Sequence, residues 1–129
     1  MKVVGELFDV GIHVETQFDP HNSLLDRNYY FFRYQITIKN NSDKILKLLY
    51  RKWEILDGNG EYREVEGPGV VGLHPVLEPG ESFTYESGCN FATDLGYMEG
   101  YYYFQDIETF NNYIVHIPKF RMNVPWKWN

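Results

Sequence analysis

Alternation of apolar and polar side chains constrains the fold of this chain more than any other feature of its sequence. Between residues 29 and 39 every second side chain is large and apolar, at Phe32, Tyr34, Ile36 and Ile38. A period of two is typical of a β-strand that buries one face. No stretch of the chain sustains the 3.6-residue period of an amphipathic helix, so we expect a structure built from strands.

Turn signals divide the remaining sequence into short strands. Residues 57–60, Asp-Gly-Asn-Gly, favour a hairpin turn because glycine and asparagine adopt positive φ at little cost. Residues 78–81, Glu-Pro-Gly-Glu, mark another turn. The pattern predicts an all-β fold in the form of an antiparallel β-sandwich, with an immunoglobulin-like or fibronectin type III-like arrangement. We expect this sandwich to be one domain that covers residues 1–129. In the strand before the hairpin we expect Leu49, Trp53 and Ile55 to share the buried face, with Arg51 between Leu49 and Trp53. Trp53 should lie between the sheets.

Charge and cysteine content exclude several classes of protein. The 129 residues include 18 acidic and 12 basic ones, a net charge of -6, which argues against nucleic acid as a partner. Cys89 is the one cysteine, so no disulfide forms within the chain and a reducing cytoplasm is the expected location. No apolar run approaches the roughly 20 residues that span a membrane, so we expect no membrane contact.

A glycine-rich segment over residues 67–72 is the first candidate binding site. Its three glycines have the spacing of a dinucleotide fingerprint, but that motif needs a following helix, which Pro75 and Pro79 exclude. Backbone amides can still converge on phosphate or pyrophosphate without a helix. Alternatively, the segment is only a crossover between strands. The candidate ligand-binding residues are Gly67, Gly69, Val70, Val71, Gly72 and, as a source of positive charge, Arg51.

Catalytic and metal-binding patterns are weak. The four histidines do not stand at metal-ligand spacings, and a lone cysteine offers no thiolate cluster. Ser82, Ser87 and Cys89 could act as nucleophiles, but no base and orienting acid stand at a fixed spacing from them. Ser87 is better explained as a turn or capping residue after a strand. We therefore expect no enzyme, no metal and no cofactor.

Aromatic residues suggest an interaction surface. The run Tyr101, Tyr102, Tyr103 and Phe104 places rings on both faces of a strand, and only one face can be the core. Clustered exposed rings are frequent at protein interfaces, although sugar stacking is an alternative use. The candidate interface residues are Tyr101, Tyr102, Tyr103, Trp126 and Trp128, and the expected partner is another protein or a second copy of this chain.

The sequence resembles the ApaG domain family (DUF525), in its bacterial stand-alone form, over about residues 11–122. The resemblance is carried by Arg51-Lys52-Trp53, by the glycine-rich segment 67–72, by Leu77-Glu78-Pro79-Gly80-Glu81 and by Ile117-Pro118-Lys119-Phe120. It implies a fibronectin- or immunoglobulin-like sandwich in a cytoplasmic protein. Lys52 and the segment Leu73-His74 depart from the family pattern, which usually has histidine and Glu-Gln at these places.

Two functional hypotheses follow. In eukaryotes the family's domain is joined to F-box proteins, so the resemblance implies a non-enzymatic module for protein–protein contact. The alternative is a small-molecule site that binds phosphate, pyrophosphate or a nucleotide at the glycine-rich segment.

Overall fold

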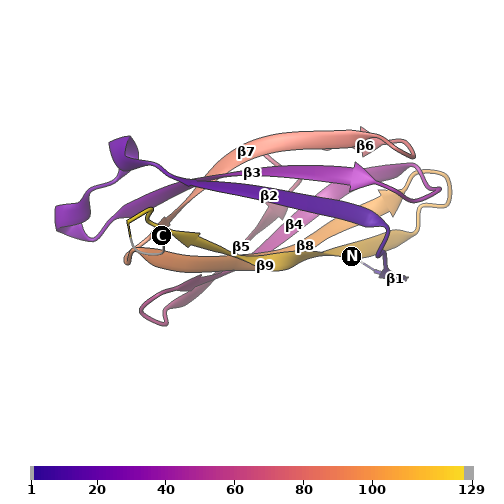
Figure 1. The fold of residues 1–129 in the computed structure, drawn as a ribbon. Helices are drawn as coiled ribbons and strands as arrows, with labels where there is room; N and C mark the ends of the chain where they lie inside the picture. Colours follow the sequence, from indigo (N-terminus) through magenta and orange to yellow (C-terminus); the bar gives the residue numbers. More distant parts are fainter. Residues whose placement is uncertain (1, 127–129) are drawn as a thin grey trace.

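Strands make up nearly all of the regular structure in the computed structural model, which describes residues 2–126 (Figure 1). Two short 3-10 helices, η1 (Pro20–Asn22) and η2 (Leu25–Arg27), separate the second strand from the third. The strands of the described residues are β1 (Gly5–Glu6), β2 (Val10–Phe18), β3 (Tyr30–Asn40), β4 (Leu46–Asp57), β5 (Tyr62–Pro68), β6 (Val76–Leu77), β7 (Ser82–Phe91), β8 (Leu95–Asp106) and β9 (Asn112–Asn123).

The strands form two sheets that lie one above the other in Figure 1. The smaller sheet has the order β2-β3-β7, and the larger one has the order β1-β9-β8-β4-β5, with β6 also paired to β4. This arrangement confirms the predicted β-sandwich. Strand pairs are antiparallel with one exception, because β1 runs parallel to β9. The two residues of β1 are too short a segment for alternation to reveal a strand.

Side chains from both sheets fill the space between the layers. Ile36 and Ile38 of β3 are fully buried, which confirms the face predicted from their alternation. Trp53 of β4 is 2% exposed and makes ring contacts with Tyr34 from the smaller sheet and Phe120 from β9, at centroid distances of 5.7 and 5.8 Å. The predicted position of Trp53 between the sheets is therefore confirmed.

A β-bulge in β4 corrects the predicted phase of that strand. The register between β4 and β8 shifts between Leu48 and Tyr50, so the alternation changes phase there. Leu48 is buried, whereas Leu49 is only half-buried. Beyond the bulge the inward residues are Arg51, Trp53 and Ile55. The prediction that Leu49 shares the face of Trp53 was wrong, because the bulge changes the phase of the strand between Leu48 and Tyr50, whereas Arg51 lies on the face of Trp53 as predicted.

Strand β7 corrects the interpretation of Ser87 as a turn or capping residue. Residues 82–91 form one continuous strand, in which Ser87 and Cys89 pair with Tyr34 and Phe32 of β3. Gly88, the residue that follows Ser87, lies under the ring of Phe31 on the opposite face. A side chain at this position would overlap that ring, so the glycine serves packing within the strand.

Candidate functional site

The glycine-rich segment forms a tight turn directly after β5. The amide of Val70 donates to the carbonyl of Leu73 at 2.9 Å, and the amide of Leu73 donates back at 2.8 Å. Val71 and Gly72 between them have φ angles of 44° and 79°. Positive φ at both central residues is the conformation of a type I′ hairpin turn, which explains the glycine at position 72. No helix follows, so a dinucleotide fingerprint is excluded.

The predicted set of four converging amides does not form in this turn. The amide of Gly69 donates to the carbonyl of Leu49 at 2.9 Å, and that of Val70 is bound to Leu73. Val70 is fully buried, which pulls this part of the segment toward the core. Of the four amides proposed for phosphate or pyrophosphate, those of Val71 and Gly72 remain as candidates.

Arg51 lies against the base of this segment on the inner side of the larger sheet. Its Nη1 donates to the carbonyl oxygens of Pro68 and Gly69, at 3.0 and 3.1 Å. Gly67 pairs with Arg51 in the β4–β5 register. A Cβ at Gly67 would stand 3.1 Å from that Nη1, so the glycine allows the guanidinium to lie close to β5. Arg51 and the glycine-rich segment are therefore brought together, as the sequence hypothesis required.

The three consecutive tyrosines of β8 divide between the two faces of the larger sheet. Tyr102 is fully buried, and its hydroxyl hydrogen-bonds that of Tyr85 from the smaller sheet. Tyr101 and Tyr103 are half-buried and point outward. The ring of Tyr103 packs edge-on against Tyr50 with centroids 5.8 Å apart. The predicted interface therefore loses Tyr102 to the core but keeps its two neighbours.

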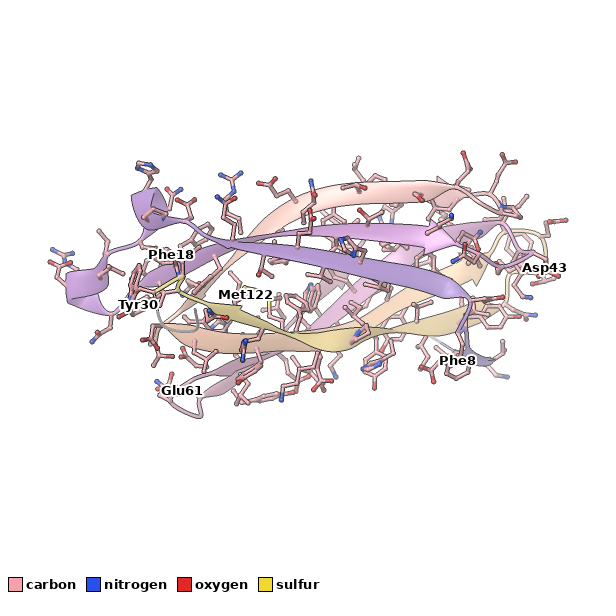
Figure 2. The ribbon with its side chains drawn as sticks, viewed as in Figure 1. Phe8, Phe18, Tyr30, Asp43, Glu61 and Met122 are labelled. Atoms are coloured by element: carbon pink, nitrogen blue, oxygen red, sulfur yellow. The ribbon has the colours of Figure 1, made fainter. Side chains whose placement is uncertain are left out.

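Trp126 lies in the turn that follows the end of β9, away from this row of tyrosines. Trp126 is 58% exposed. Its ring packs against the ring of Phe18 of β2, with centroids 5.5 Å apart. Figure 2 shows Phe18 on the strand that borders this end of the sandwich. Trp128, the other predicted interface residue, lies outside the described residues.

Three carboxylates form a row across three adjacent strands on the outer side of the larger sheet. Glu54 of β4 pairs with Glu64 of β5 on one side and with Glu99 of β8 on the other. Lys52 Nζ lies 2.9 Å from Glu64, and it lowers the pKa of that carboxyl by hydrogen bonding and charge attraction. His116 Nε2 lies 3.6 Å from Glu99. Within residues 2–126, no basic group lies within 4.0 Å of the Glu54 carboxylate.

Tyrosine rings flank this acidic row on both sides along the strands. Tyr50 and Tyr103 lie toward one end of the sheet, while Tyr62 and Tyr97 lie toward the other. A shallow pocket of about 160 Å³ at the second end is lined by Glu54, Leu56, Tyr62, Tyr97, Met98, Glu99 and Lys119. We use "outer face" for the solvent-facing side of the larger sheet, which includes Tyr50, Lys52, Glu54, Tyr62, Glu64, Tyr97, Glu99, Tyr101, Tyr103 and His116.

The candidate nucleophile Cys89 is held as a thiol. It is buried, and this burial raises its pKa to about 11, although the nearby Arg63 guanidinium acts in the opposite direction. A thiol with this pKa is protonated near neutral pH and is a poor nucleophile. Among residues 2–126, no group of three or more His, Cys, Asp or Glu side chains is arranged to hold a metal ion.

Reasoning from the sequence missed Arg63 and the positions of Glu54 and Glu99 beside Glu64. The signal for both was the predicted hairpin over residues 57–60. The loop pairs Asp57 with Glu61, and in the resulting register Glu54 stands opposite Glu64 while Arg63 shares a face with Arg51. Glu99 could not be placed in this way, because β8 is distant in sequence from β4.

Comparison with known proteins agrees with the resemblance in the sequence. The family model described as ApaG domain matches residues 20–106. The chain is 42% identical to Protein ApaG of Methylocella silvestris over 118 residues, which are 92% of this chain and 90% of that protein. It is 40% identical to Protein ApaG of Acidithiobacillus ferrooxidans over 114 residues, 88% of this chain and 89% of the relative.

A solved structure shows the same fold. A Bordetella pertussis protein described as ApaA superposes with a TM-score of 0.87 at 34% identity, covering 93% of this chain and 97% of the other. None of the helices within residues 2–126 is long and apolar enough to cross a bilayer. On the family match and on these two relatives, the chain belongs to the ApaG domain family.

Proposed function

We propose that this chain is a non-catalytic protein-binding module that docks on a basic surface of its partner through the outer face of the larger sheet. The observation that supports this most strongly is the acidic row Glu64, Glu54 and Glu99, whose members stand directly opposite one another on three adjacent strands. Like charges in directly opposite positions destabilise a sheet. A feature that opposes stability on a solvent-facing surface is typical of a functional site.

Charge complementarity defines the kind of partner. Lys52 and His116 approach the two ends of the row, and Glu54 in the middle has no basic group within ion-pair distance among the described residues. A lysine or arginine of a partner would relieve the repulsion at Glu54. The tyrosines on either side supply rigid rings with a polar tip, the kind of residue that is enriched in protein interfaces.

We also infer that the module acts without catalysis, in the cytoplasm, and belongs with immunoglobulin-like and fibronectin type III-like sandwiches. The buried Cys89 thiol, with its raised pKa, supports the absence of a cysteine nucleophile, and the presence of a single cysteine suits a reducing compartment. The pairing of a three-stranded sheet with a larger one supports the structural class. A phosphate or nucleotide site at the glycine-rich turn is less well supported, because two of its four amides are bound within the protein.

The test is site-specific photo-crosslinking in cells. A photoreactive phenylalanine derivative replaces Tyr103 on the outer face, and in a matched variant it replaces Gln35, which is exposed on the opposite side of the sandwich. We expect a discrete cross-linked protein from position 103 and none from position 35. Equal cross-linking from both positions, or none from position 103, would contradict the proposal.

Self-association is distinguished by the mass of the product. A cross-linked species of twice the chain mass, together with concentration-dependent sedimentation of the purified protein, identifies a second copy as the partner. The chain carries a net charge of -6, and Glu54 in the acidic row has no basic group within ion-pair distance among the described residues. A second copy would bring another acidic row toward this one, so we expect a partner other than this chain.

A further inference from the structure

A cleft opens between the two sheets on the side where β5 and β7 are the edge strands. Both strands pair on one side only, β5 with β4 and β7 with β3. The cleft has a volume of about 250 Å³, and two arginines, Arg51 and Arg63, lie among its lining residues. It is separate from the outer face, because these arginines are on the inner side of the larger sheet.

Each guanidinium is fixed by hydrogen bonds to uncharged groups. Arg63 Nη2 donates to the carbonyl of Asn90 at 2.7 Å and to Cys89 Sγ at 3.3 Å, which ties β5 to β7 across the cleft. Arg51 Nη1 donates to two backbone carbonyls at the base of the glycine-rich turn. These bonds involve one nitrogen of each side chain, whereas a guanidinium carries five N–H donors on three nitrogens.

Neither positive charge is neutralised by a carboxylate. In the part of the chain that the structure describes, no Asp or Glu oxygen lies within 4.0 Å of Arg51 or Arg63. Arg33, on the outer side of the smaller sheet, shows the contrast, because its Nε donates to Glu86 at 2.8 Å. Two half-buried guanidinium groups without a counter-charge are unusual in a chain with a net charge of -6.

Polar groups on the opposite wall add to this arrangement. The hydroxyl-bearing side chains of Ser87 and Tyr34 also line the cleft. Val65 and Trp53 supply apolar surface beside the arginines. The cleft therefore combines two fixed cations, hydroxyl groups and an apolar wall, which suits an anionic group carried on a small organic molecule.

We propose that this cleft is a binding site for an oxyanion, held between the guanidinium groups of Arg51 and Arg63. The planar donor fork of arginine matches both carboxylate and phosphate oxygens and can bind either in bidentate fashion. Gly67 belongs to the site indirectly, because its missing side chain lets the Arg51 guanidinium lie against β5. The site uses Arg51 but not the amides of the glycine-rich turn.

The experiment is a titration followed by the NMR signals of the arginine Nε–H groups in the full chain. Inorganic phosphate is the probe in one arm and acetate in the other, so the two arms identify which oxyanion the cleft prefers. We expect saturable shifts of the Arg51 and Arg63 signals, with Arg27 of η2 unchanged. We expect Arg63→Gln and Arg51→Gln each to weaken the affinity for the preferred oxyanion about ten-fold or more, in line with the loss of one charge-assisted contact.

Two further variants keep this test decisive. Arg27→Gln removes the same charge outside the cleft and should leave the affinity within about two-fold of the original. Val65→Glu keeps both arginines but places a carboxylate in the cleft, from a residue that is 41% exposed and therefore tolerant of change. It should abolish the saturable shifts even if an arginine variant fails to fold.

Three outcomes would overturn the inference. These are an absence of saturation with both probes at millimolar concentration, equal affinity in the Arg27 and Arg63 variants, and shifts confined to the amides of Val71 and Gly72. The last result would place the oxyanion in the glycine-rich turn instead. None of them bears on the outer face, which is tested by cross-linking.

Discussion

The hydroxyl groups of Tyr85 and Tyr102 hydrogen-bond to each other in the core, one from each sheet of the sandwich. Tyr102 is fully buried and Tyr85 is 6% exposed, so this polar contact lies where apolar packing would be expected. Burial raises the pKa of both phenols well above their usual value of about 10. The pair therefore joins the two layers as neutral hydroxyls.

Removal of one hydroxyl from this pair should leave the other buried without its partner. We predict that Tyr102→Phe lowers the free energy of unfolding by about 1–3 kcal/mol, because an unsatisfied buried polar group carries its full desolvation penalty. The double variant Tyr85→Phe, Tyr102→Phe removes both groups together and should be closer to wild type than the single variant. Urea denaturation of the four proteins in the cycle measures this coupling. Additive losses would show that the two hydroxyls act independently.

Trp53 should be among the largest single contributors to stability. Its ring meets Tyr34, Tyr102 and Phe120, which brings together β3, β4, β8 and β9. Trp53→Ala should lower the free energy of unfolding by about 3–5 kcal/mol, as is typical for truncation of a buried large aromatic side chain. A urea melt gives the value directly. A loss below about 1 kcal/mol would be incompatible with the described position of this ring.

Stability should fall in mildly alkaline solution because of Cys89. Burial raises its pKa in the folded protein from an ordinary value of 9.0 to about 11, so the unfolded chain loses this proton first. The stabilising contribution is therefore complete below about pH 9 and is lost as the pH rises toward about 11, at up to roughly 1.4 kcal/mol per pH unit. Urea midpoints at about pH 8 and about pH 10 measure the decline.

Cys89→Ala is the control for this pH dependence. It removes the titrating thiol, so the decline between about pH 9 and pH 10 should become smaller, while the later effect of the buried tyrosines remains. An identical decline in both proteins would show that the thiol is not the cause.

Alternation in the sequence was sufficient to predict the inner face of β3 and the position of Trp53. It failed at Leu49, because a β-bulge changes the phase of a strand without any fixed signal in composition. The interpretation of Ser87 as a turn or capping residue was wrong, because β7 continues through Gly88, whose missing side chain makes room for the Phe31 ring. Local patterns give the periodicity of a strand, whereas bulges and close contacts depend on its neighbours.

The candidate sites were predicted less completely than the fold. The glycine-rich segment and Arg51 are adjacent as proposed, but hydrogen bonds within the chain occupy the amides of Gly69 and Val70. To predict which tyrosines of β8 face solvent, the phase of that strand must be known. The structure shows that this phase places Tyr102 in the core. The acidic row depends on long-range pairing between Glu54 and Glu99, which no local feature of the sequence determines.

Reversal of one charge in the acidic row tests the proposed function most directly. Glu54→Lys places a cation between Glu64 and Glu99, which should relieve repulsion and leave the free energy of unfolding unchanged or raise it by up to about 1 kcal/mol. The same variant should lose its basic partner. The measurement is the yield of the cross-link from position 103, compared with Glu15→Lys on the exposed strand β2 as a matched change of charge. We predict that the yield disappears with Glu54→Lys and persists with Glu15→Lys. An unchanged yield in a folded Glu54→Lys protein would contradict the assignment of the outer face as the binding surface.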